Sequence, residues 1–76
     1  MFIVKLFRGG TRNPRQIEFY TTPTPVIKPM VNGENPGILH QVEIPIQNKS
    51  EMIDVMEGDV CFIENADGVT IHSIRN

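Results

Sequence analysis

The chain has 76 residues, a formal net charge of −2 and one cysteine, Cys61. This length gives one domain, residues 1–76, with a thin core, and one cysteine excludes an internal disulfide and a cysteine-rich zinc site. The apolar runs are far shorter than the roughly 20 residues of a membrane-spanning helix, so we expect no membrane partner, and the lone thiol favours a cytoplasmic location.

Charge is distributed unevenly along the chain. Residues 1–15 hold four basic residues and no acid, whereas residues 50–74 hold six acids and neither Lys nor Arg. The basic segment is suited to an acidic ligand. The same polarity also allows the positive end of one copy to meet the negative end of the next, and both interpretations stay open.

Alternating side chains predict two strands near the N-terminus. Residues 2–8 are rich in β-branched and aromatic side chains and end at a Gly-Gly pair, which predicts a strand. Residues 9–15 have the composition of a loop. Residues 16–21 alternate again and predict a second strand, with Ile17 and Phe19 on its more apolar face.

Prolines dominate the middle of the chain. Pro23, Pro25 and Pro29 each remove a backbone donor, so we expect an extended edge segment here. Residues 38–47 then show the clearest period-two pattern in the chain, which predicts a strand with one buried face. Pro45 indicates that part of this strand lies at an edge or a bulge.

Residues 48–57 show a different period, which predicts one short helix. Asn48 can cap this helix, with Glu51 as its capping-box partner. The apolar residues on one helical stripe are Met52, Ile53 and Met56.

The C-terminal part predicts a tight hairpin. Residues 60–63 and 69–74 read as strands, and the polar, glycine-containing segment 65–68 is typical of the turn between them. The fold class expected from five short strands is all-β with one short helix, arranged as a small barrel or sandwich.

The sequence offers no constellation suited to catalysis. Cys61 lies in an apolar strand, where a buried, unactivated thiol is favoured over a nucleophile. His40 and His72 are far apart and lack the spacing of a zinc site, and the glycine spacing of phosphate-binding loops is absent. We therefore expect no enzyme, no catalytic residue, no metal and no cofactor.

The basic loop is the clearest candidate for binding. Arg8, Arg12 and Arg15 flank or occupy it, and a guanidinium group can bind two phosphate oxygens at once. Phe7 and Tyr20 are expected on the accessible faces of the neighbouring strands, where they could stack on bases. The alternative is a solvated loop that keeps the protein soluble.

The five-strand pattern and residues 62–69 resemble the Sm/LSm family, small bent barrels that form rings and bind RNA, including Sm-like proteins of phage origin. The resemblance implies a five-stranded, strongly bent SH3-like barrel and a homo-oligomeric ring of about five to seven copies. Ring neighbours would pair strand 69–74 with strand 60–63 of the next copy. It also implies a location in the cytoplasm of a bacterial host if the chain is phage-encoded. The family's RNA-contacting Arg-Gly would fall at Asn65-Ala66.

Two functions are compatible with these features. The first is a ring-forming Sm-like module that binds RNA or single-stranded DNA and acts in RNA or DNA processing. Its nucleic-acid-binding residues would be Arg8, Arg12 and Arg15 on phosphates and Asn32 and Asn65 on bases. The second is a structural or protein-interaction module, such as a small phage assembly or host-binding protein, with the acidic stretch 51–67 as its contact face. The negative net charge and the missing Arg-Gly favour this second function.

Overall fold

The computed structural model describes residues 1–29, 38–46 and 49–75, which contain strands and no helix. The strands are β1 (Phe2–Arg8), β2 (Gln16–Thr22), β3 (Val26–Pro29), β4 (Ile38–Ile46), β5 (Lys49–Met56), β6 (Val60–Glu64) and β7 (Thr70–Arg75). The all-β class is therefore confirmed. In the described part of the chain no helix exists that could cross a membrane.

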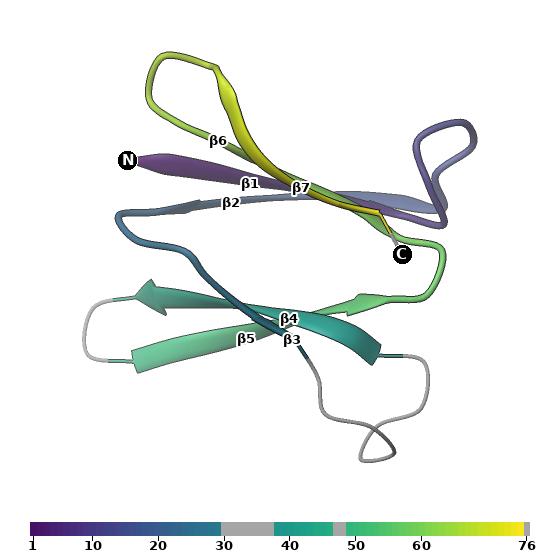
Figure 1. The fold of residues 1–76 in the computed structure, drawn as a ribbon, viewed down its shortest axis with the longest axis horizontal. Coiled ribbons are helices and arrows are strands. Elements are labelled where there is room, and N and C mark those ends of the chain that lie inside the picture. The colour runs from purple at the N-terminus through teal and green to yellow at the C-terminus, as the bar shows by residue number, and fades with distance from the viewer. Residues whose placement is uncertain (30–37, 47–48, 76) are drawn as a thin grey trace.

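The strands form two antiparallel sheets that face each other (Figure 1). One sheet has the order β2-β1-β6-β7 and the other has the order β3-β4-β5. The expected five-stranded, strongly bent barrel is wrong, because the described strands are seven and form two separate sheets. Pro23 and Pro25 lie between β2 and β3, and proline cannot donate to a ladder, so the chain leaves one sheet here and enters the other.

The core lies between the sheets and is lined by alternate residues of five strands. Because successive side chains of a strand point to opposite faces, β1, β4, β5 and β6 each contribute two alternate residues, and β7 contributes one. The buried members are Val4, Leu6, Val42, Ile44, Ile53, Val55, Cys61, Ile63 and Ile74. The predicted burial of Cys61 is thus confirmed. The predicted burial of one face of the 38–47 strand is confirmed at Val42 and Ile44.

The helix predicted for residues 48–57 is wrong, because Lys49–Met56 form strand β5. The stripe of Met52, Ile53 and Met56 is not a buried face: Ile53 and Val55 are buried, whereas Met52 and Met56 are exposed. That is period two. A segment of this length gains little from helix propensity alone, and pairing with β4 along eight residue pairs decides its conformation.

The prolines behave as expected from their chemistry. β3 is short and lies at the edge of its sheet, as predicted for the segment after Pro25. Pro45 pairs with Ser50 of β5, and β3 covers β4 only from His40 to Glu43. The side of Pro45 away from β5 is therefore an edge.

Candidate nucleic-acid interface

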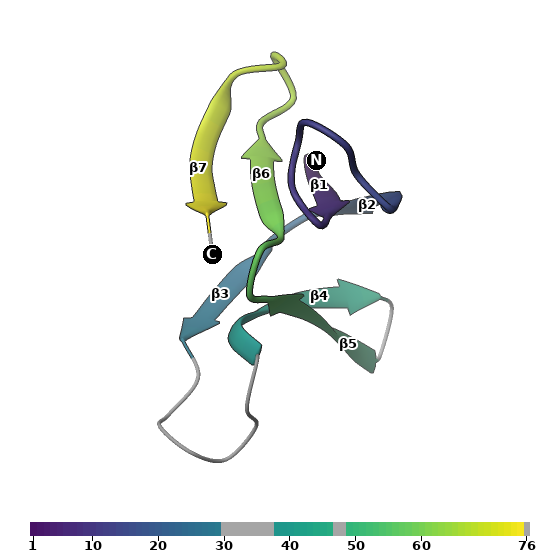
Figure 2. The same ribbon diagram turned by 90° about the vertical axis from the view of Figure 1, so that its right-hand side faces the viewer.

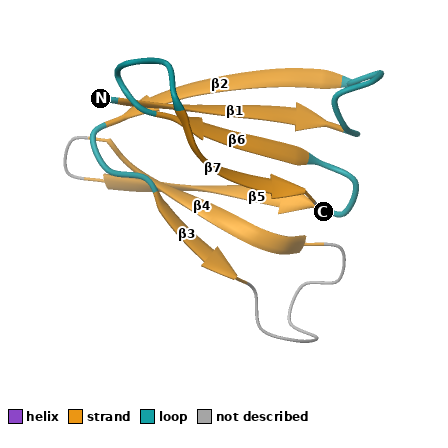
Figure 3. Cartoon of the chain, turned by 45° about the horizontal axis from the view of Figure 1, so that its top comes forward, coloured by secondary structure: helices purple, strands orange, loops and turns teal. Residues whose placement is uncertain are grey.

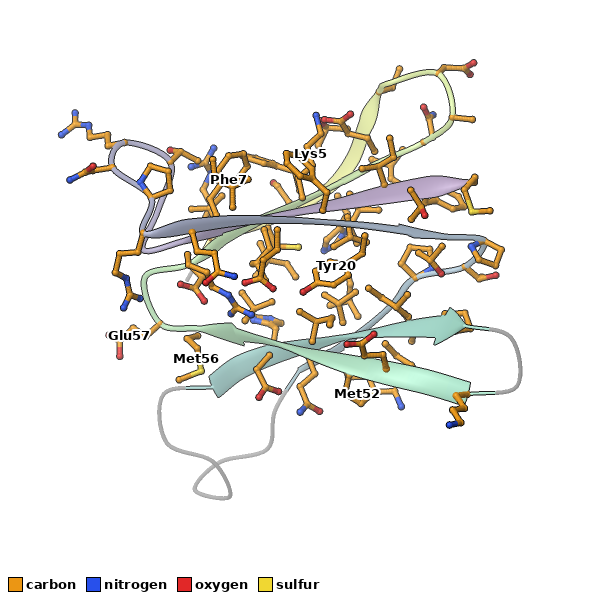
Figure 4. The ribbon with its side chains drawn as sticks, turned by 180° about the vertical axis from the view of Figure 1, so that it is seen from behind. Lys5, Phe7, Tyr20, Met52, Met56 and Glu57 are labelled. Carbon is orange, nitrogen blue, oxygen red and sulfur yellow. The ribbon has the colours of Figure 1, made fainter. Side chains whose placement is uncertain are left out.

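The four-stranded sheet has an outer face that turns away from the second sheet. Since Val4 and Leu6 point into the core, the odd-numbered residues of β1 point outward. Lys5 lies directly opposite Phe19 of β2 and Phe62 of β6. Figure 4 shows Lys5 and Phe7 on this outer side, whereas Tyr20 points between the sheets. Three adjacent strands thus form a row of Phe19, Lys5 and Phe62.

Aromatic rings and cations are neighbours on this outer face. The rings of Phe7 and Phe62 pack edge to face, with centroids 5.8 Å apart and an interplanar angle of 74°. The guanidinium of Arg75 lies 5.5 Å from the centroid of Phe62, within cation–π range. Phe19 is 63% exposed. The face therefore offers one widely exposed ring and two half-buried rings beside positive charge.

The charge on the face is largely balanced at its centre. Lys5 Nζ lies 2.8 Å from the Oε2 of Glu64, and both side chains are partly exposed. The side chains are 31% and 17% exposed, so the pair is only partly screened by solvent. The charge of Lys5 is therefore already balanced by Glu64 within the folded chain.

The loop 9–15 continues the outer face at one end. Figure 1 shows it rising from the ends of β1 and β2, on the side away from the three-stranded sheet. Its base is closed by a hydrogen bond from the Arg15 amide to the Arg8 carbonyl oxygen, 2.8 Å long. Arg12 and Arg15 are exposed, and among the described residues neither takes part in an ion pair. Both guanidinium groups are available to an anion.

Gly9 shapes this loop through a positive backbone angle. Its φ is +85°, a conformation that side-chain-bearing residues rarely adopt. A Cβ at this position would also lie 3.1 Å from the Arg15 Nε. The sequence predicted only a loop from the Gly-Gly pair. Gly9 also makes room for the side chain of Arg15.

Arg8 points the opposite way, into the space between the sheets. Its Nε donates to the Oε2 of Glu18 at 2.6 Å, and its Nη1 donates to the Asp54 carbonyl oxygen at 2.5 Å and to the Oδ2 of Asp59 at 2.9 Å. Arg8 thus joins the two sheets and holds the base of the loop. A phosphate that contacted Arg8 would have to compete with these three acceptors.

Asp59 is the buried centre of this network. Its Oδ1 accepts from the Gly9 amide at 2.9 Å, and its Oδ2 accepts from the Met56 amide at 3.0 Å as well as from Arg8. Burial acts to raise the pKa of Asp59, but the hydrogen bonds from Gly9, Arg8 and Met56 outweigh it, so the pKa lies below its usual value. The carboxylate stays ionised.

Glu18 and Tyr20 extend the same network along β2. The hydrogen bond from Arg8, supported by one from the Tyr20 hydroxyl, lowers the pKa of Glu18. Burial and the neighbouring Glu18 carboxylate raise the pKa of Tyr20 to about 12. Tyr20 packs against the core and is not on the accessible face where we expected it. On β2 the outward aromatic residue is Phe19.

The two predicted base-contacting asparagines have different positions. Asn32 lies outside the described residues. Asn65 is in the β6–β7 turn, where its Oδ1 accepts from the amides of Asp67 and Val69 at 2.9 and 3.0 Å. This turn rises at the opposite end of the outer face from loop 9–15 (Figure 1). With a rise of about 3.3 Å per residue, β1 separates the two ends by roughly 20 Å.

Folding brings the basic and acidic halves of the sequence together. Lys5 pairs with Glu64, and Arg8 pairs with Asp59. Both contacts follow from the pairing of β1 with β6. The polarity along the sequence is thus partly neutralised within one copy, and the cations that remain outside ion pairs in the basic half are Arg12 and Arg15.

The acidic stretch 51–67, the expected contact face of the alternative function, is divided by the fold. Glu51 and Glu57 are exposed on or just after β5, whereas Asp59 is buried. Glu64 belongs to the outer face of the other sheet. The stretch therefore does not form one continuous acidic surface.

The residues that the sequence singled out for catalysis or metal binding are dispersed. Cys61 is buried, and burial raises the pKa of its thiol to about 11. His40 is half-buried on β4 and His72 is exposed on β7. Within the described ranges, no three His, Cys, Asp or Glu residues are grouped so that they could hold a metal ion.

Sequence reasoning missed Lys5, Phe62 and Arg75 as members of the outer face. The sequence of each strand shows which side chains alternate between its two faces. Only the strand order β2-β1-β6-β7 brings these residues onto one face with Phe19. A period-two pattern also leaves open which of the two faces is buried. The signal that could have found Lys5 and Phe62 is the matching alternation of residues 2–8 and 60–63, whereas Arg75 lies outside both stretches.

Comparison of the chain with models of protein families, with curated proteins and with solved structures finds no match.

Proposed function

We propose that the protein binds single-stranded nucleic acid, RNA or single-stranded DNA, across the outer face of the β2-β1-β6-β7 sheet. The observation that carries the proposal is the row of Phe19, Lys5 and Phe62 on three adjacent strands. Every base has a π-face that can stack on an aromatic ring, and phosphates need cations nearby. This face supplies both kinds of group within one surface.

The side chains divide into two roles. Phe19, with 63% of its surface exposed, is the main stacking ring. The guanidinium of Arg75 lies over the ring of Phe62, and a base can stack on this guanidinium as the second platform. Arg12 and Arg15 on loop 9–15 contact phosphates at the end of the face. Arg8 acts indirectly, because its bonds to Glu18 and Asp59 fix the base of the loop.

A single strand suits this face better than a duplex. The bases of a duplex are stacked on each other, whereas a single strand can lay its bases flat on a sheet. The face is also bounded by loop 9–15 and the β6–β7 turn at opposite ends (Figure 1). Asn65 in that turn is the further candidate for a base contact. An Sm-like ring of about five to seven copies stays part of the proposal, and it would repeat this surface around the ring.

The test measures the affinity of fluorescein-labelled oligo(U) and oligo(dT) by fluorescence anisotropy at several salt concentrations. Stacking on one base is worth about 1–3 kcal/mol, so Phe19→Ala should weaken binding about tenfold. Arg12→Gln with Arg15→Gln removes two phosphate contacts and should reduce the slope of log affinity against log salt by about 1.4.

Two matched controls belong to this test. Met52→Ala removes an exposed apolar side chain from β5 in the other sheet, and Lys49→Gln removes an exposed cation there. Both should leave the affinity unchanged. If the wild-type protein binds neither oligonucleotide at low salt, or if Phe19→Ala and the arginine variant bind like wild type, the proposal is wrong.

A protein-interaction module is the second candidate function, favoured by the aliphatic residues on the same face. Ile17 and Ile71 are 45% and 52% exposed, and exposed apolar patches often mark protein contacts. This function predicts no oligonucleotide affinity at low salt. It predicts instead a defined protein partner, for example a phage assembly or host protein, whose binding is lost in Ile71→Lys.

A further inference from the structure

Each sheet of the described chain ends in two strands that have one open edge. These are β2 and β7 in the larger sheet and β3 and β5 in the smaller one. Figure 3 shows the larger sheet in the order β2, β1, β6, β7. An open edge presents unpaired backbone groups, and proteins usually protect it with lysine, proline or inward-pointing charge.

The smaller sheet has protected edges. β3 ends in Lys28 and Pro29. β5 contains Lys49, Glu51 and Asp54. Charged side chains of this kind oppose the addition of another strand. Neither edge is suited to pairing with a second chain.

The larger sheet is less protected on both sides, because neither of its edge strands contains a lysine or a proline. β7 contains no proline, lysine or acid, and its one full charge is Arg75 at its end. β2 contains no proline or lysine. Its one charge is Glu18, which points inward but is already paired with Arg8 of the same copy, so it does not repel an added strand. The charges of the two strands have opposite signs, so no repulsion opposes their pairing.

Both of these edge strands also leave apolar side chains exposed to solvent. In β7 only Ile74 is buried, and Figure 2 shows β7 at the margin of the sheet with β6 as its neighbour. Ile71 of β7 and Phe19 of β2 are more than half exposed. Apolar side chains therefore line both open edges on the outer face, where an added strand would cover them.

The directions of the strands decide how two copies fit. β2 and β6 both run antiparallel to β1, and β7 runs antiparallel to β6. β7 therefore runs parallel to β1 and opposite to β2. When a second copy is added in the same orientation, its β2 comes beside β7 of the first copy as an antiparallel neighbour. The outer faces of the two copies then lie on the same side.

We infer that copies of this chain associate head to tail, with β7 of one copy pairing with β2 of the next in a continuous antiparallel sheet. This differs from the pairing of strands 69–74 and 60–63 that we expected, because β6 already has β1 and β7 as neighbours. Head-to-tail contacts close into a ring or continue as a filament. Ile71 comes beside the β2 edge of the next copy, so the outer faces join into one surface. The inference supplies the contact between copies for the ring included in the proposed function, and it does not require nucleic-acid binding.

The experiment measures solution mass by size-exclusion chromatography with light scattering on nuclease-treated protein. Ile71→Lys places a protecting lysine on the β7 edge, and Ile17→Lys places one on the β2 edge. Met52→Lys puts the same charge on the already protected β5 edge and is the control. All three positions are exposed, so the far-ultraviolet circular dichroism of each variant should match wild type.

The wild type and Met52→Lys should both have a mass well above one chain, whereas each of the two edge variants alone should be a monomer. An equal mixture of Ile71→Lys and Ile17→Lys should form dimers, because the free β7 edge of one variant meets the free β2 edge of the other. A monomeric wild type at every concentration, an Ile17→Lys variant that still associates alone, or a mixture that stays monomeric would each overturn the inference. Because no oligonucleotide is present, these outcomes are independent of the binding test.

Discussion

The Nη1 atom of Arg8 lies 2.9 Å from the Oδ2 of Asp59, which is fully buried and 51 residues further along the chain. The same carboxylate accepts hydrogen bonds from the amides of Gly9 and Met56. One side chain thus connects the start of loop 9–15, the end of β5 and, through Arg8, the carboxylate of Glu18. The position of the basic loop on the outer face depends on this network.

Replacing Asp59 with Asn should destabilise the protein strongly. The substitution leaves Arg8 without one of its charged partners and places an amide where two backbone amides donate, and breaking a buried ion pair on one side costs about 3 kcal/mol or more. We expect the free energy of unfolding in urea to fall by about 3 kcal/mol. Asp67→Asn in the exposed β6–β7 turn is the control and should change it by less than about 0.5 kcal/mol. Equal stability of the two variants would contradict the assigned role of Asp59.

Stability should decrease at acid pH for the same reason. Hydrogen bonds lower the pKa values of Asp59 and Glu18 in the folded protein, whereas the unfolded chain has values near the ordinary 3.8 and 4.5. The unfolded state therefore binds protons first, so this stabilisation is complete above about pH 5 and is lost as the pH falls through the folded values. Urea titrations between pH 7 and pH 2 should show the decline. Glu18→Gln should make it shallower, and an unchanged pH profile in this variant would be evidence against the network.

The sequence predicts individual strands well where alternation is strong and turns are marked. The bounds of β1, β2 and the β6–β7 hairpin agree with the predicted ones within a residue or two. β5 was missed because Met52, Ile53 and Met56 also fit a helical stripe. The residues that distinguish a strand from a helix here are Ile53 and Val55. Their burial could be known only from the pairing of β5 with β4.

The candidate site could be predicted only in part, since it is assembled from strands that are distant in sequence. The exposed Arg12 and Arg15 were found from composition alone. Arg8 looks equivalent to them in the sequence, yet it points inward, because position 8 has the same parity on β1 as Val4 and Leu6. No local pattern states which parity faces the core.

The thiol of Cys61 should be inert in the folded protein. Burial raises its pKa to about 11, and the thiolate is the reactive form. With an Ellman-type disulfide reagent at pH 8, we expect slow labelling in buffer and fast labelling in denaturing urea. Ser73→Cys adds an exposed thiol on β7 and should give one fast and one slow reaction. Fast labelling of the wild-type protein in buffer would show that the core opens more readily than its packing indicates.

Substitutions at Asn65 should separate its role in the turn from a role in binding nucleic acid. Its Oδ1 accepts hydrogen bonds from the amides of Asp67 and Val69, so Asn65→Ala should lower the free energy of unfolding by about 1 kcal/mol. Asn65→Asp keeps the acceptor oxygen and should leave stability within about 0.5 kcal/mol of wild type. It removes the amide group that could donate to a base and adds a negative charge at the end of the outer face. If Asn65 contacts the ligand, Asn65→Asp should therefore weaken oligonucleotide binding at unchanged stability. Wild-type affinity in this variant would restrict Asn65 to its structural role in the turn.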